Sequence, residues 1–132
     1  MKKLIFLIPV LLIAANLYSQ KLYFCEEYRN GDEIGVSDVF IIGSNGGYFT
    51  CMVDLRNVYE TINTRKVSLE IYRVTSYDDV YLSTETFDVQ PGWDYIFFDK
   101  FYTFYTAGKY RIKAYRSDGS YVAAGNVTIK MR

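Results

Sequence analysis

The sequence predicts an all-β protein, a single antiparallel β-sandwich of about seven or eight strands. Its 132 residues include 14 Tyr and 9 Phe beside many Val, Ile and Thr, which are the residue types that favour strands. No segment keeps apolar residues three or four positions apart over ten residues, so no helix is expected. Turn residues instead recur about every ten to fifteen positions, which is typical of connected antiparallel strands.

Four strands are expected in the first half of the chain, at 21–28, 38–42, 48–55 and 66–74. The third and fourth alternate in character, so each has one inward face. The inward faces comprise Phe49, Cys51, Val53 and Leu55, and then Val67, Leu69 and Ile71. The Gly-rich stretch 43–47 is predicted to be a hairpin loop. The stretch 56–66 either holds a turn of helix or crosses between the sheets.

Four more strands are expected at 80–89, 95–104, 108–115 and 121–130. The strand at 80–89 carries many Thr and Ser and is predicted to lie at a sheet edge. The last two strands turn Tyr110, Ile112 and Ala114, and then Val127 and Ile129, toward the core. Asp118-Gly119 lies between them and suits a tight hairpin turn that needs positive φ.

The stretch TAGKYRIKAY at 106–115 resembles the Gly-x-Tyr-x-hydrophobic strand of immunoglobulin-like and fibronectin type III-like sandwiches. The resemblance implies that Tyr110 is the corner tyrosine, which hydrogen-bonds to backbone, and that Ile112 is its core neighbour. The hairpin that ends in GNVTI is similar to the final strand pair of many bacterial surface domains. Ile112 stands where true immunoglobulin domains have their second Cys, so the resemblance implies an architecture and no catalytic or ligand residues.

Aromatic rings crowd the stretch 91–111, and they raise the question of whether they form a core or a surface. Nine rings fall there: Trp93, Tyr95, Phe97, Phe98, Phe101, Tyr102, Phe104, Tyr105 and Tyr110. Both faces of an extended 95–104 strand would be apolar. One face must line the core, and the N-terminal strands, a partner or a ligand must cover the other. A bulge near Asp99-Lys100 would exchange the two faces.

Rings with a polar tip are typical of protein interfaces and of sugar-binding platforms. We therefore take Trp93, Tyr95, Tyr102 and Tyr105 as candidate binding residues. Three interpretations stay open for this stretch: core with half-buried tyrosines, a protein interface, and a carbohydrate platform.

The first 19 residues have the layout of a secretory signal peptide, with cleavage expected after Ser19. Lys2 and Lys3 precede an apolar run at 4–15, which is too short to span about 30 Å of hydrocarbon. Residues 20–132 would then form one domain with no membrane span. The compact start is typical of bacteria, so the expected location is the periplasm, the cell surface or the medium.

The charge and the cysteine content of this domain limit which partners it can have. Without its signal the chain has 13 basic and 15 acidic residues, which argues against a nucleic-acid partner. Cys25 and Cys51 would form one disulfide in an oxidising compartment, or remain two buried thiols. The sequence leaves this pairing open.

Few catalytic arrangements are available to this chain. It has no His, which excludes His-based triads and His metal sites, and no phosphate-binding Gly motif. Neighbouring acids such as Asp32-Glu33 point to opposite faces of a strand. The acidic turns at 30–33 and 77–79 do not match a calcium loop. We expect no enzyme activity, no cofactor and no metal.

The sequence therefore predicts an exported, non-catalytic binding or structural module of the bacterial cell envelope. Its partner would be an envelope protein, bound for adhesion or assembly. The alternative is a carbohydrate-binding module that uses surface aromatic residues and takes a glycan.

Overall fold

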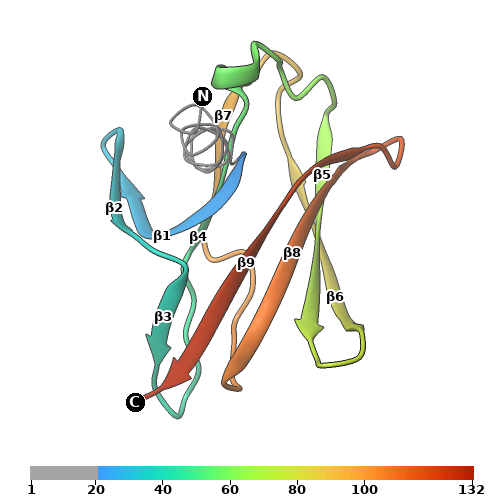
Figure 1. Ribbon diagram of the computed structural model, residues 1–132. Helices are drawn as coiled ribbons and strands as arrows, with labels where there is room; N and C mark the ends of the chain where they lie inside the picture. Colours follow the sequence, from blue (N-terminus) through green and yellow to red (C-terminus); the bar gives the residue numbers. More distant parts are fainter. Residues whose placement is uncertain (1–20) are drawn as a thin grey trace, which may run out of the picture.

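The computed structural model describes residues 21–132, which form nine strands in two sheets (Figure 1). The predicted signal peptide lies outside the described residues. The strands are β1 (Leu22–Arg29), β2 (Asp32–Val36), β3 (Val39–Ile42), β4 (Thr50–Asp54), β5 (Lys66–Val74), β6 (Asp79–Asp88), β7 (Tyr95–Phe98), β8 (Gly108–Arg116) and β9 (Tyr121–Met131). Within 21–132 the sole helical element is the 3-10 turn η1 (Arg56–Val58).

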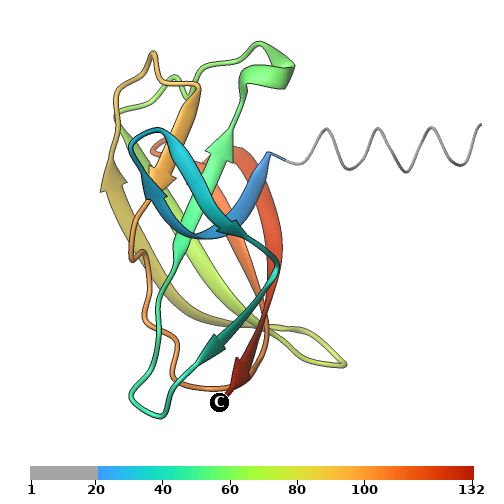
Figure 2. The same ribbon diagram turned by 90° about the vertical axis from the view of Figure 1, so that its left-hand side faces the viewer.

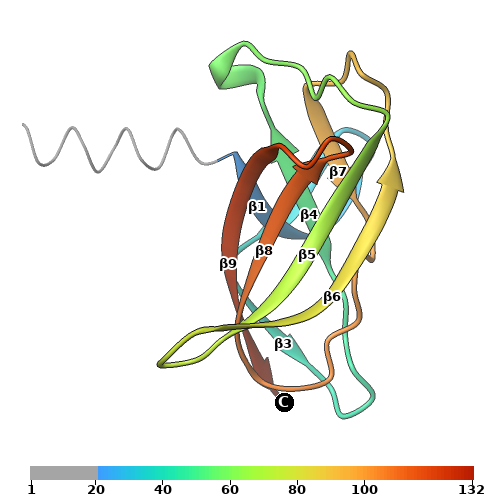
Figure 3. The same cartoon turned by 90° about the vertical axis from the view of Figure 1, so that its right-hand side faces the viewer.

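The two sheets face each other across the core (Figures 2 and 3). One sheet has the order β2-β1-β4-β7, and the other has the order β3-β9-β8-β5-β6. The prediction of an all-β protein with two packed sheets is confirmed. The inward residues predicted for β5 (Val67, Leu69, Ile71) and for β8 (Tyr110, Ile112, Ala114) are all buried. The prediction of β6 as an edge strand is also confirmed.

The prediction that every strand is antiparallel is wrong for one pair. β3 runs parallel to β9, with Val39 opposite Thr128, so the larger sheet is mixed. The Gly-rich stretch 43–47 does make a tight turn, in which the Gly46 amide donates to the Gly43 carbonyl oxygen at 3.0 Å, but the predicted hairpin is wrong because the flanking strands do not pair. β3 and β4 belong to different sheets, and the Gly-rich stretch crosses between them. The stretch 56–66, where η1 lies, also crosses between the sheets, as expected.

One strand was missed by the sequence analysis. Asn30 and Gly31, with φ of 53° and 84°, form a tight turn, and the chain then returns along β1 as β2. β1 is shared between two partners, because its residues 22–25 pair with β4 and its residues from Cys25 onward pair with β2. This arrangement places the β1–β2 hairpin at one end of the four-stranded sheet (Figure 2).

The aromatic strand predicted at 95–104 is shorter than expected. β7 ends at Phe98, and a turn follows in which Lys100 has a φ of 49°. Before this turn the even-numbered Ile96 and Phe98 face the core, and after it Phe101 does so. Residues 99–107 form no strand beyond an isolated bridge at Phe104, and Phe101 and Phe104 are both buried, so the strand ends here and is not continued by a bulge that exchanges its faces.

Tyr110 and the two cysteines lie inside the molecule. The Tyr110 hydroxyl donates a hydrogen bond to the Thr106 carbonyl oxygen at 2.7 Å. Both cysteines are buried free thiols. Cys25 lies opposite Thr50, and Cys51 lies opposite Phe24, so the two thiols point to opposite faces of one sheet. Two side chains in this arrangement cannot be bridged without backbone movement.

Candidate binding surfaces

The N-terminal hairpin covers part of the second aromatic face of β7. The ring of Tyr28 stacks on that of Phe97 with 4.5 Å between centroids, and it meets Tyr95 edge-on at 5.8 Å. Glu33 of β2 accepts hydrogen bonds from the hydroxyls of Tyr23 and Tyr95. Of the three covers that the sequence allowed, the structure therefore contains the first, the N-terminal strands.

These contacts fix the charges beside Tyr95. Burial and the hydrogen bond to Glu33 raise the pKa of both Tyr23 and Tyr95, so both phenols keep their protons to a higher pH than a solvent-exposed tyrosine does. The Arg56 guanidinium lies 3.8 Å from the Tyr95 ring centroid. Its hydrogen bond and its 2.8 Å ion pair with Asp54 lower the pKa of that carboxyl. The polar groups on the inner part of this face therefore bond to one another.

Beyond the hairpin, aromatic surface remains open to solvent. Trp93 is 46% exposed and Phe97 is 49% exposed. They line an open groove of about 380 Å³, which we call the aromatic groove and which consists of Asp88, Trp93, Tyr95, Ile96 and Phe97. The groove lies where the end of β6 approaches β7, since Phe87 and Phe98 meet there with 5.1 Å between ring centroids.

Backbone hydrogen bonds hold Trp93 at this groove. Its amide donates to the carbonyl oxygen of Gln90 at 3.0 Å, which closes the turn that follows β6. Its carbonyl oxygen accepts from the amide of Ile62 at 2.7 Å, which ties the turn to the crossover between the sheets. The ring is therefore presented by a braced turn and not by a free loop.

The four candidate binding residues do not form one surface. Trp93 and Tyr95 share the aromatic groove, whereas Tyr102 and Tyr105 lie beyond the turn at Lys100. Tyr102 is half-buried and packs edge-on against Phe104 at 4.9 Å. Tyr105 is 65% exposed and lies over Gly46, where an added Cβ would meet its ring at 2.8 Å.

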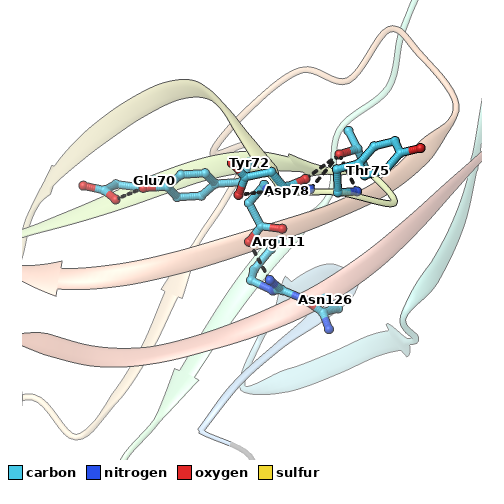
Figure 4. Close-up of polar contacts among 8 residues, drawn as sticks. Glu70, Tyr72, Thr75, Asp78, Arg111 and Asn126 are labelled. Carbon is cyan, nitrogen blue, oxygen red and sulfur yellow. Dashed lines mark hydrogen bonds and ion pairs between the residues drawn. The ribbon is translucent and has the colours of Figure 1, made fainter.

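A second surface covers the outer face of the five-stranded sheet, and Figure 4 shows part of it. The Tyr72 hydroxyl donates to Glu70, and this hydrogen bond raises the pKa of Tyr72 to about 12. Arg111 pairs with Asp79, and its Nε donates to the Asn126 side-chain oxygen at 2.9 Å. Polar side chains from four neighbouring strands thus interlock on this face.

One end of this face forms a hollow of about 470 Å³ that we call the polar groove. It is lined by Ser68, Glu70, Thr84, Tyr115, Arg116, Ser117 and Gly119. Its lining residues carry hydroxyls, a carboxylate, a guanidinium and a tyrosine ring, of which the Glu70 carboxylate accepts from Tyr72 and the Arg116 guanidinium donates to the Ile62 carbonyl oxygen. No site was predicted here from the sequence. The signal was the alternation of 66–74, which turns Ser68 and Glu70 away from the core.

Residues 21–132 were searched for metal-binding clusters and for helices that could span a membrane, and neither was found. No group of three or more His, Cys, Asp or Glu in this part of the chain is arranged to hold a metal ion. No helix there is long and apolar enough to cross a membrane. Among the neighbouring acids, Glu33 binds two tyrosines and Asp79 binds Arg111.

Comparison with known proteins gives no family. No protein-family model matches the chain, and a search of curated proteins finds no significant relative.

Proposed function

We propose that the protein is an exported, non-catalytic module of the bacterial cell envelope that binds another protein. The observation that carries this proposal is the aromatic groove, where Trp93 and Phe97 each leave about half of a large ring in water. Tyr and Trp are enriched at protein interfaces, where a buried ring contributes much of the binding free energy. Export is inferred from the charged and apolar layout of residues 1–19.

We also propose that the sandwich is immunoglobulin-like. The order β9-β8-β5 in one sheet and β1-β4-β7 in the other supports this assignment, as does the parallel pairing of β3 with β9. The hydrogen bond from the Tyr110 hydroxyl to Thr106 supports a tyrosine corner at the start of β8. A rigid sandwich of this kind presents its outer faces and edges to partners.

A non-catalytic role agrees with the bonding of the acidic side chains. The chain has no His. Glu33 is occupied by two tyrosine hydroxyls, and Asp79 is occupied by Arg111. We infer that these carboxylates act in structure.

The test is retention of envelope proteins on the purified full chain, tagged at its C-terminus and immobilised. We expect one protein, identified by mass spectrometry, to be retained repeatedly by the unchanged chain and lost with the double variant Trp93→Ala and Phe97→Ser. The matched control is Tyr77→Ala, because Tyr77 is 98% exposed in the turn between β5 and β6. Equal retention by the groove variant, or repeated retention of nothing, would overturn the proposal.

The polar groove favours carbohydrate binding as the second candidate function. Sugars bind through hydroxyls and through stacking on rings, and Ser68, Thr84 and Tyr115 offer both. The same immobilisation with a panel of insoluble polysaccharides tests it. Retention on a polysaccharide that is lost with Tyr115→Ala and kept with the double variant Trp93→Ala and Phe97→Ser would support this candidate over the first.

A further inference from the structure

β7 is an open edge of the four-stranded sheet. It stands last in the order β2-β1-β4-β7, and within residues 21–132 no strand pairs with its other side. The Leu55 amide donates to the Asp94 carbonyl oxygen at 2.7 Å. Antiparallel pairs alternate between bonded and non-bonded, so Ile96 and Phe98 point their backbone groups at β4. The N–H and C=O groups of Tyr95 and Phe97 therefore point away from the sheet.

The edge of β7 and the aromatic groove coincide. Tyr95, Ile96 and Phe97 belong to both, and Asp88 at the end of β6 also lines the groove. The ring contact between Phe87 and Phe98 lies beneath, where β6 and β7 meet. A strand laid against β7 would find backbone partners on one side and aromatic surface beside them.

Charge decides what kind of strand fits. From 74 to 99 the chain has no Lys or Arg, and it has six acids: Asp78, Asp79, Glu85, Asp88, Asp94 and Asp99. Asp79 pairs with Arg111, and Asp88 forms an exposed pair with Lys66. The other four make no ion pair within the described part of the chain. Asp94 and Asp99 flank β7, while the cations beside the groove, Arg56 and Lys66, are already paired with Asp54 and Asp88. Antiparallel pairing of two copies through this edge would therefore bring Asp94 and Asp99 together.

We propose that an extended, Lys- or Arg-bearing segment of a partner polypeptide adds to the open edge of β7 as a further strand. Its backbone bonds to Tyr95 and Phe97, and a basic side chain lies over the ring of Trp93 or Phe97 near Asp88. Strand addition takes affinity from backbone hydrogen bonds and specificity from alternate side chains. A cation over an exposed ring adds to it. This inference rests on the proposed protein-binding function and names its mode and the chemistry of the partner.

The probe is a seven-residue peptide with Lys at every second position and Val or Thr between, acetylated and amidated at its ends. Trp93 is the single Trp of the chain, so its emission reports binding directly. We expect a saturable change of emission that weakens as NaCl rises from about 50 to about 500 mM, since exposed charges are screened. The same peptide with Glu in place of Lys should give no change. An equal response to both peptides would overturn the basic character of the partner.

Two substitutions at position 97 separate the contribution of the ring to peptide binding from that of the backbone N–H. Phe97→Thr removes the ring and keeps the N–H, whereas Phe97→Pro removes both and spares the ladder to β4. Proline is tolerated on an edge strand when its missing donor faces outward. We expect Phe97→Pro to bind about fivefold more weakly than Phe97→Thr, which is typical of one lost hydrogen bond. Equal affinities would overturn strand addition.

Hydrogen exchange on the unchanged chain keeps the test decisive if Phe97→Pro does not fold. The amides of Tyr95 and Phe97 should exchange quickly in the free protein and slowly with the Lys peptide, while that of Ile96 is protected in both. Unchanged exchange at saturating peptide would overturn the proposal. So would a concentration-dependent shift to dimers through this edge, measured by sedimentation. The proposed function is decided separately, by whether retention of a protein depends on Trp93 and Phe97.

Discussion

Two clusters of aromatic rings use the same residue types in opposite ways, one inside the sandwich and one on its outer face. The inner cluster consists of Phe24, Phe49, Phe101 and Phe104, each at most 3% exposed. The outer cluster consists of Tyr28, Trp93, Tyr95 and Phe97, which are half-buried or exposed. Both draw on the aromatic stretch 91–111, so ring content alone does not decide whether a ring is core or surface.

The difference lies in the side of the strand and in what covers it. Phe49 stands at the centre of the inner cluster, with ring centroids 5.0 Å from Phe104, 5.5 Å from Phe101 and 5.7 Å from Phe24. These rings have no polar tip that needs a partner. In the outer cluster the Tyr95 hydroxyl is held by Glu33, and the β1–β2 hairpin covers one side only. The inner rings therefore stabilise the fold, and the outer rings are left for contacts.

The largest expected effect comes from truncating one ring of each cluster. Phe49→Ala should lower the free energy of unfolding by about 3–5 kcal/mol, because it leaves a cavity among packed rings. Phe97→Ala should lower it by less than about 1 kcal/mol, since half of that ring is already in water. Urea unfolding followed by circular dichroism measures both. A loss at Phe97 as large as that at Phe49 would show that the outer cluster is core.

The turn that separates the clusters predicts an intermediate effect. Lys100 has a φ of 49°, a conformation that costs an L-residue about 1–2 kcal/mol and a β-branched residue more. Lys100→Gly should therefore keep or raise stability, although it loses the contact of the Lys100 ammonium with the Tyr48 ring at 4.9 Å. Lys100→Val should lower it, measured by the same urea curves. If Val and Gly had the same effect on the free energy of unfolding, the positive φ at position 100 would carry no strain.

Strand faces could be predicted from the sequence because alternation is a local property. Val67, Leu69 and Ile71 are buried together for that reason, and no distant contact was needed to place them. β2 could not be found in the same way. Its residues are largely exposed, so it has no apolar alternation. Its first two residues are acidic, and they were assigned to the preceding turn. The end of β7 was missed because a positive φ at a lysine has no sequence signal.

The outer cluster could be predicted only in part. The sequence indicated that the second face of the aromatic stretch needed a cover, and it offered the N-terminal strands as one of three. It could not pair Tyr28 with Phe97, because these residues are far apart in the chain and meet only through the bend of β1. The open edge at Tyr95 and Phe97 likewise follows from sheet order, which local patterns do not encode.

The smallest expected effect concerns Glu33, which accepts a hydrogen bond from Tyr23 within the hairpin and another from Tyr95 of β7. Burial and the hydrogen bond to Glu33 raise the pKa of Tyr23 above its unfolded value of about 10. Above pH ~10 the unfolded chain releases this proton before the folded chain does, so the free energy of unfolding falls as pH rises. The contribution is fully present below pH ~10. Tyr23→Phe should therefore flatten the alkaline decline of the urea midpoint between pH 8 and about 11 without abolishing it, because Tyr95 keeps its raised pKa.

Tyr77→Phe is the control, since Tyr77 is almost fully exposed and should leave the decline unchanged. Parallel declines for Tyr23→Phe and the unchanged chain would mean that folding does not raise the pKa of Tyr23 through Glu33, and the links between the hairpin and β7 would then be the Tyr95 hydroxyl on Glu33 and the stacking of Tyr28 on Phe97.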